Sequence, residues 1–106
     1  MLPAENRLKN KEDFSQIMRD GSRAKFGPLM FFTQNTASCP RIGFVISKRV
    51  SKLSSERNQV RRHLREIFRG IVTDLAGKDV VVSVLSLPKN GRTDLEDATK
   101  RWQKSL

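Results

Sequence analysis

The sequence predicts a single small α+β domain, residues 1–106, in which helices pack on a mixed β-sheet. Three observations support this prediction. The chain has 106 residues and 37% of them are hydrophobic, which is enough for one modest core. Segments with helical periodicity and β-rich segments follow one another in the order αβββαβα. A strand, a long helix and another strand over 41–86 form a βαβ unit, which favours a parallel pair of strands.

The first predicted helix covers residues 11–20. Asn10 stands before it as a capping residue, and Gly21 stands where it should end. Apolar side chains at positions i, i+3 and i+4 give this helix one inward face, formed by Phe14, Ile17 and Met18.

Three stretches have the composition of β-strands, and a shorter fourth strand is possible. The turn-forming residues "TASCP" separate "LMFFTQN" (29–35) from "RIGFVIS" (41–47), and a short additional strand is compatible with 22–26. The stretch "DVVVSVLS" (79–86) is almost continuously apolar, which is typical of a central strand that a helix covers.

Two more helices are predicted, one after the strand at 41–47 and one after the strand at 79–86. The longer one begins near Ser55, runs to about Leu75 and is ended by Gly77. Thr93 and Glu96 have the spacing of a capping box, which would open a last helix. The inward residues of that helix are Leu95, Ala98 and Trp102.

The long helix separates apolar from basic side chains. At 100° per residue, its apolar residues share one arc: Val60, Leu64, Ile67, Phe68 and Ile71. A neighbouring arc contains no acid and consists of Arg57, Asn58, Arg61, Arg62, Arg65 and Arg69. Glu56 and Glu66 lie outside that arc. A helix stabilised by its own ion pairs would intersperse glutamates among the arginines. The pattern therefore predicts an external polyanion.

Positive charge is concentrated around this helix. The formal net charge of the chain is +10, and residues 41–69 contain nine basic and two acidic residues. The loop before the helix, "SKRVSKLSS" (47–55), adds Lys48, Arg49 and Lys52. Such focused charge favours nucleic acid as the partner. A solvated helix face remains an alternative. A membrane-surface helix is a weaker one, because packing on a sheet explains the apolar arc better.

The sequence offers few groups for catalysis. His63 is the only histidine and Cys39 the only cysteine, so neither a multi-histidine nor a cysteine-based metal site is expected. We interpret His63 as a partly exposed helix residue and Cys39 as a small buried or loop residue. Acidic residues at 12–13 and 94–97 fall in first turns of helices, and there is no glycine-rich phosphate loop. We expect no catalytic residue and no metal site in this chain.

No run approaches the roughly 20 apolar residues that cross a bilayer, and "MLPAENRLKNKEDF" at the N-terminus lacks an apolar segment. We therefore expect a cytoplasmic protein without membrane association.

The stretch "RNQVRRHLRE" (57–66) resembles the signature helix of the bacterial ribonuclease P protein subunit. The signature positions are matched by Arg57, Asn58, Arg61, Arg62 and Arg65. The flanks agree in order over about 85 residues, with "NRLKNKEDF" and Gly21 before the helix, "RIGFVISKRV" directly before it and a valine-rich strand after it. Gln59 departs from the family, which often has an arginine there, and Met18 and Phe32 replace a frequent Phe and Tyr.

The resemblance implies an α/β sandwich with a left-handed βαβ crossover, against the right-handed base rate. It also implies a partner, a catalytic RNA that uses Mg²⁺ to remove the 5′ leader from precursor tRNA, with one protein per RNA. The residues expected to bind RNA are Lys48, Arg49, Lys52, Arg57, Asn58, Arg61, Arg62, Arg65 and Arg69.

A cleft between the first helix and the sheet is expected, from the same resemblance, to hold the single-stranded leader. Its expected lining is Phe14, Met18, Phe32 and Phe44, with Arg57, Asn58 and Arg61 at its edge. The phenylalanines have an alternative interpretation, because aromatic residues at this spacing are commonly core residues. Two other functions also remain open. One is a ribosomal-type RNA-binding scaffold without a role in cleavage, and the other is a protein-only nuclease.

Overall fold

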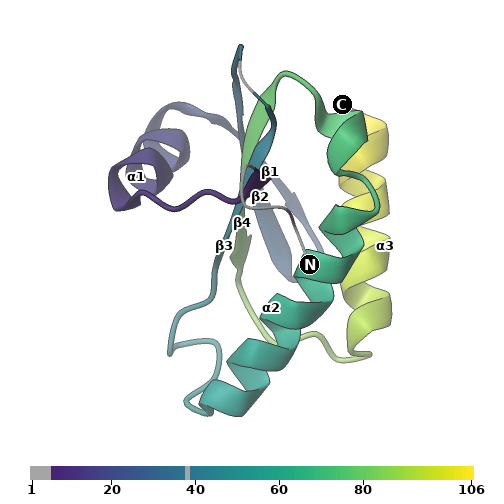
Figure 1. The fold of residues 1–106 in the computed structure, drawn as a ribbon. Coiled ribbons are helices and arrows are strands. Elements are labelled where there is room, and N and C mark those ends of the chain that lie inside the picture. Colours follow the sequence, from purple (N-terminus) through teal and green to yellow (C-terminus); the bar gives the residue numbers. More distant parts are fainter. Residues whose placement is uncertain (1–5, 38) are drawn as a thin grey trace.

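The computed structural model, which describes residues 6–37 and 39–106, is built in three layers (Figure 1). Helix α1 (Lys11–Asp20) lies on one face of a four-stranded sheet. Helices α2 (Ser54–Arg69) and α3 (Arg92–Ser105) lie side by side on the other face. The predicted α+β fold and its αβββαβα order are confirmed.

The sheet contains β1 (Ser22–Phe26), β2 (Leu29–Asn35), β3 (Arg41–Val45) and β4 (Lys78–Val84), in the spatial order β1-β2-β4-β3. The β1–β2 and β2–β4 pairs are antiparallel, whereas β3 and β4 are parallel. The short strand at 22–26 and the parallel pair are therefore both confirmed. Strands β3 and β4 end at Val45 and Val84, two residues before their predicted ends.

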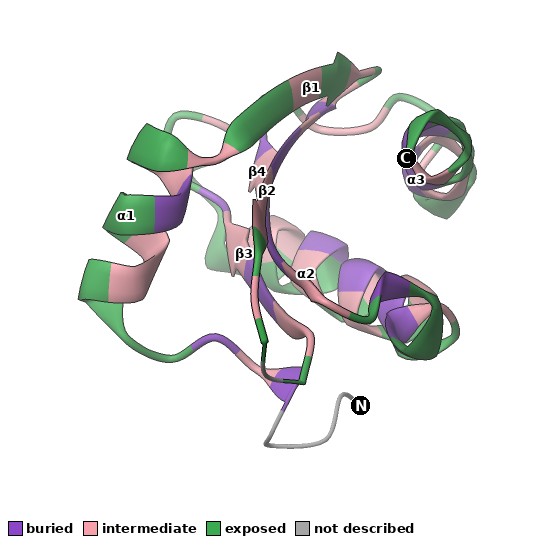
Figure 2. Cartoon of the chain, turned by 90° about the horizontal axis from the view of Figure 1, so that it is seen from above, coloured by how far each residue is buried: buried purple, intermediate pink, exposed green. Residues whose placement is uncertain are grey.

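The crossover from β3 through α2 to β4 is left-handed. Both strands run downwards in Figure 1, with β3 nearer the viewer and α2 to the right of the sheet. Figure 2, seen from above, shows the same relation. Left-handed crossovers are rare among βαβ units. The resemblance to the ribonuclease P protein family implied this handedness, and the structure agrees with it.

The larger part of the core lies between the sheet and the two long helices. Phe31 of β2 stacks on Trp102 of α3 with ring centroids 4.5 Å apart, and Phe68 of α2 lies 6.0 Å from the same indole. The inward residues predicted for α3 are all buried, as are Val60, Leu64 and Phe68 of α2. The apolar arc of α2 therefore packs on the sheet, as its periodicity predicted.

A smaller cluster joins α1 to the opposite face of the sheet, with Leu8, Ile17, Phe32 and Val81 buried in it. Gly21 ends α1 as predicted, although its φ of −75° is an ordinary one. The reason is close approach, because a Cβ there would lie 2.5 Å from the carbonyl oxygen of Ile17 and 2.6 Å from that of Thr33.

The predicted end of the long helix was wrong. Helix α2 ends at Arg69 and not near Leu75, and a 3₁₀ turn follows at Val72–Leu75. The amide groups of Gly70 and Ile71 donate to carbonyl groups three residues earlier, as in a 3₁₀-helix. The α-helix ends here because glycine is a weak helix former. This turn buries Val72 and leads the chain towards the start of β4.

The caps of α1 and α3 also differ from the prediction. Asn10 precedes α1, but its side chain makes no capping hydrogen bond. Helix α3 begins at Arg92, so the Thr93–Glu96 capping box is wrong. Instead, Asp94 accepts hydrogen bonds from the backbone and side-chain nitrogens of Asn90, at 2.9 and 3.2 Å. These bonds lower the pKa of Asp94. Their contribution to stability is therefore lost only as the pH falls below the ordinary carboxyl range.

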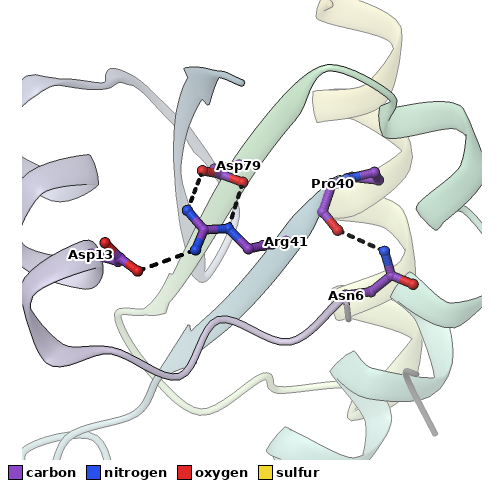
Figure 3. A network of polar contacts seen from close by, with 5 residues as sticks. All are labelled: Asn6, Asp13, Pro40, Arg41 and Asp79. Carbon is purple, nitrogen blue, oxygen red and sulfur yellow. Dashed lines mark hydrogen bonds and ion pairs between the residues drawn. The ribbon is translucent and has the colours of Figure 1, made fainter. Parts of the chain in front are cut away.

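Arg41 connects three elements through two carboxylates (Figure 3). From β3, its Nε and Nη2 donate to both oxygens of Asp79 on β4, at 3.2 and 2.8 Å. Its Nη1 donates to Asp13 of α1 at 3.2 Å. Asp79 is buried, and its ion pair raises the pKa of Arg41. This cluster (Arg41, Asp13 and Asp79), which we call the Arg41 clamp, fixes one end of α1 to the sheet.

The segment before α1 is held against the outer edge of β3. The amide of Leu8 donates to the carbonyl oxygen of Ile42 at 3.0 Å, and Arg7 forms a parallel bridge with Ile42. The side-chain amide of Asn6 donates to the carbonyl oxygen of Pro40 at 2.7 Å (Figure 3). The edge strand is therefore partly covered by the chain itself, which limits pairing with other chains.

We predict that Arg41→Gln lowers the free energy of unfolding by about 2 kcal/mol, because it leaves the buried Asp79 carboxylate without its cation. The loss should stay below the roughly 3–5 kcal/mol of a fully buried pair, since the Arg41 side chain is 35% exposed. Arg19→Gln is the matched control, because the Arg19–Asp20 pair is exposed and should contribute under about 0.5 kcal/mol. Urea unfolding of both variants measures the difference, and equal midpoints would show that the clamp adds nothing.

Candidate RNA interface

The arginines of α2 lie on the side of the helix that the core leaves open. Asn58, Arg62 and Arg69 are exposed, and Arg57, Arg61 and Arg65 are partly buried. We call these six residues, together with Lys48, Arg49 and Lys52 of the preceding loop, the basic face. The buried Val60, Leu64 and Phe68 anchor the opposite side of the helix on the sheet, so packing directs the basic face outwards.

No acidic side chain among the described residues forms an ion pair with the basic face. In residues 6–37 and 39–106, none of the α2 arginines forms an ion pair. Arg61 only donates to the side-chain oxygen of Asn58, at 3.1 Å. Glu66 turns away to pair with Arg92 of α3. The expectation that the acids of α2 lie apart from its arginines is confirmed.

The loop before α2 is tied to the first turn of that helix by Ser51. Its hydroxyl donates to the carboxylate of Glu56 and accepts from the amide of Leu53 at 3.1 Å. Arg57 donates from Nη1 to the carbonyl oxygen of Ser51 at 2.7 Å. These bonds hold the three exposed loop cations beside the helix. Arg57 therefore also has a structural role that the sequence did not reveal.

Arg41 is basic by sequence but is not part of this face. It was counted among the nine cations of residues 41–69, yet its guanidinium is bound by Asp79 and Asp13. Its position at the start of β3, opposite two carboxylates, explains the difference. Of the nine basic residues in 41–69, eight are therefore available to a partner.

The residues proposed for the leader cleft divide between the two faces of the sheet. Phe14 and Met18 are partly exposed on α1, and Phe32 lies beneath them with 7% exposure. The ring of Phe14 covers Gly43, where a Cβ would lie 2.3 Å from its Cζ. Only a glycine in β3 lets that ring approach so closely.

Phe44 does not share that face, which corrects its grouping with the other three. Side chains alternate along a strand, so Phe44 points to the side opposite Gly43 and contacts Phe68 of α2, with ring centroids 5.6 Å apart. It packs against the larger core cluster and is partly exposed.

A pocket of about 110 Å³ lies at the β3 edge, where both sides of the sheet can be reached. Its lining comes from the N-terminal segment, α1, β3 and α2, and consists of Arg7, Leu8, Phe14, Ile42, Gly43, Phe44, Arg61 and Arg65. Sequence reasoning missed Arg7, because nothing local indicates that the N-terminal segment pairs with β3. We call this the edge pocket.

The other residues considered for chemistry lie apart. His63 is partly buried, as predicted, beside a separate pocket that includes Gln59 and Leu87. Cys39 is exposed in the β2–β3 loop. Within the described residues, no three His, Cys, Asp or Glu side chains gather to hold a metal ion. No helix among them is long and apolar enough to span a membrane.

Comparison with known proteins agrees with the resemblance. A family model described as Ribonuclease P matches residues 2–106. This chain belongs to the ribonuclease P protein family. It is 42% identical over 91 residues to the ribonuclease P protein component of a Pseudanabaena species, covering 82% of this chain and 78% of that one. Identity to the component of Blochmanniella pennsylvanica is 34% over 109 residues, covering 99% and 95%.

Solved structures show the same fold. The ribonuclease P protein of Staphylococcus aureus superposes with a TM-score of 0.84 at 22% identity, over 94% of each chain. That of Thermotoga maritima gives 0.78 at 21% identity, over 94% of this chain and 96% of the other. Membership of the family makes this chain the protein component of a tRNA-processing ribonucleoprotein endoribonuclease and implies an RNA partner.

We predict that Arg62→Ala weakens binding to the ribonuclease P RNA and lowers the slope of log K against log salt by about one, because one phosphate contact is lost. Arg62 is exposed and makes no ion pair among the described residues, so the fold should be unaffected. The control is Arg101→Ala, which removes an equal charge from α3, where Arg101 pairs with Asp97 at 3.0 Å. Filter binding across a salt series measures both slopes. Equal changes in the two variants would contradict a localised RNA interface.

Proposed function

We propose that this protein binds the catalytic RNA of ribonuclease P through its basic face. We also propose that it holds the 5′ leader of precursor tRNA beside α1 and so assists removal of the leader. The observation that carries the proposal is that none of the α2 arginines forms an ion pair with a described residue. Five guanidinium groups on one helix would repel one another without a polyanion, and a phosphate backbone supplies anions along such a surface.

The leader would lie where α1 meets the sheet. Phe14 and Met18 offer partly exposed apolar surface there, and unpaired bases are commonly held by stacking on such side chains. Phe32 is too buried to stack fully and would instead support the two residues above it. Arg57, Asn58 and Arg61, in the first half of α2, would contact the leader backbone.

The phosphodiester hydrolysis is assigned to the RNA, with Mg²⁺ held mainly by RNA phosphates. Within residues 6–37 and 39–106, no three His, Cys, Asp or Glu side chains gather into a metal site, and several carboxylates are already bound by arginines. Asp13 and Asp79 bind Arg41, Glu66 binds Arg92, and Asp97 binds Arg101. The role left to the protein is to neutralise phosphate charge and to position the substrate.

The alternative is a ribosomal-type scaffold that binds RNA without affecting cleavage. Adding the purified protein to its cognate catalytic RNA at low Mg²⁺ separates the two functions. We expect the protein to increase cleavage of precursor tRNA, because it replaces counterions that the RNA alone must recruit. Unchanged cleavage together with tight RNA binding would favour the scaffold. A preparation that still cleaved after RNase treatment would instead indicate a protein-only nuclease.

We predict that Phe14→Ala weakens binding of precursor tRNA to the reconstituted enzyme by about tenfold, in line with the roughly 1–3 kcal/mol of stacking per base, while mature tRNA binding barely changes. Phe26→Ala is the matched control. Phe26 is also partly buried, but it lies on the other face of the sheet against Phe31. That variant should lose stability without losing discrimination. Thermal melts accompany both binding assays, and an equal loss for both tRNAs at unchanged melting would remove Phe14 from the leader site.

We predict that His63→Ala leaves cleavage by the reconstituted enzyme within about threefold of wild type. His63 faces the α2–α3 side near Leu87 and Pro88, away from the basic face. Single-turnover cleavage measures the effect. A loss beyond roughly 100-fold, which is typical of a removed general acid or base, would contradict chemistry in the RNA.

A further inference from the structure

The edge pocket contains three arginines from two distant parts of the chain. Arg61 and Arg65 reach it from α2, and Arg7 reaches it from the segment before α1. Its other described lining residues are apolar or glycine, so no carboxylate among them balances the charge. Three cations around one small cavity repel one another, and their arrangement costs free energy unless an anion joins them.

The side chain of Arg7 is a second observation that points to an anion. Its Nε is buried and has no hydrogen-bond acceptor among the residues that the structure describes. A buried donor without an acceptor costs roughly 1–3 kcal/mol, and native structures contain few of them. The backbone bridge to Ile42 and the hydrogen bond from Leu8 to the same residue hold Arg7 in place. Its backbone is therefore fixed beside the pocket before any ligand arrives.

The size and walls of the pocket restrict what it can hold. Its volume of about 110 Å³ is below the roughly 300–1,000 Å³ of pockets that enclose a whole small molecule. It is several times the roughly 30 Å³ that one water occupies in the liquid. The pocket is therefore suited to a single small group such as one tetrahedral anion, and not to a whole small molecule. The rings of Phe14 and Phe44 add apolar surface on which an attached sugar or base can rest.

We propose that the edge pocket binds a single phosphate group of single-stranded RNA, with Arg7, Arg61 and Arg65 as its donors. The inference rests on the proposed function, because it takes RNA as the ligand, and it adds Arg7 as an RNA-binding residue outside α2. RNA is favoured over an acidic protein segment because the pocket continues the basic face through Arg61 and Arg65. The phosphate comes from the leader or from a single-stranded part of the catalytic RNA.

The test compares Arg7→Gln with Lys9→Gln. Lys9 is exposed, lies two residues away and does not line the pocket, so both variants lose one charge from the same segment. The probe for the free protein is a fluorescent single-stranded pentanucleotide RNA. We expect Arg7→Gln to bind it at least about tenfold more weakly, as charge-assisted hydrogen bonds are lost. Its salt slope should fall by about 0.7. Lys9→Gln should change binding by less than about twofold.

Two further measurements assign the source of the phosphate. The first is the affinity of each variant protein for the catalytic RNA. The second is the affinity of the enzyme reconstituted with each variant for precursor tRNA and for mature tRNA. If Arg7→Gln weakens only the binding of precursor tRNA, the phosphate belongs to the leader. If it weakens only the binding of the catalytic RNA, the phosphate belongs to that RNA. If Arg7→Gln and Lys9→Gln behave alike in every assay, the pocket is not a phosphate site and the proposal fails.

A misfolded variant, or a failure of the proposed function, must be told apart from a failure of the pocket assignment. Nuclear magnetic resonance titration of the wild-type protein with the pentanucleotide needs no variant. The amides of Gly43 and Phe44 should shift, and shifts confined to the exposed loop before α2 would overturn the proposal. If wild-type protein stimulates cleavage but the two variants match, the pocket assignment fails and the function stands. If Arg7→Gln loses pentanucleotide binding but the wild type has no effect on cleavage, the site stands and the function fails.

Discussion

Parallel pairing of β3 with β4 forces the chain to cross one face of the sheet through α2, and the position of the charged groups depends on that crossing. The apolar arc of α2 packs on the sheet through Val60, Leu64 and Phe68, so its arginines must face outwards. The loop between β3 and α2 then lies at the end of the sheet, where Ser51 and Glu56 tie its cations to the helix. Hydrophobic packing thus orients a surface whose own interactions are repulsive.

The arginines of this protein have different surroundings although they are chemically alike. Arg41 stands beside two carboxylates, one of them buried, and acts as a structural clamp between β3, β4 and α1. Arg92 and Arg101 join acids on α2 and α3. The α2 arginines face outwards, without an ion pair in the part of the chain that the structure describes. This unequal distribution of acids, more than the net charge, makes the basic face a candidate interface.

The two sides of the sheet serve different purposes. The α2–α3 side is closed by a stack of Phe31, Phe68 and Trp102 and carries the stability of the domain. The α1 side is covered by one short helix that is fixed at the Arg41 clamp and by a few apolar contacts. It therefore leaves Phe14 and Met18 partly exposed. A thinly covered face beside a basic helix suits a ligand that is both charged and aromatic, as single-stranded RNA is.

The sequence by itself determined the element order, the two arcs of α2, the inward face of α3 and the signature that indicates the family. These features depend on periodicity and on residues close together in the chain, which a single sequence records directly. It misplaced the end of α2 and the cap of α3, because alternative local hydrogen bonds decide where a helix begins and ends. Only the tertiary structure decided that Arg41 is neutralised, that Phe44 faces α2 and that Arg7 joins Arg61 and Arg65. Each of these depends on strand register and on contacts between residues far apart in sequence, for which the local pattern carries no signal.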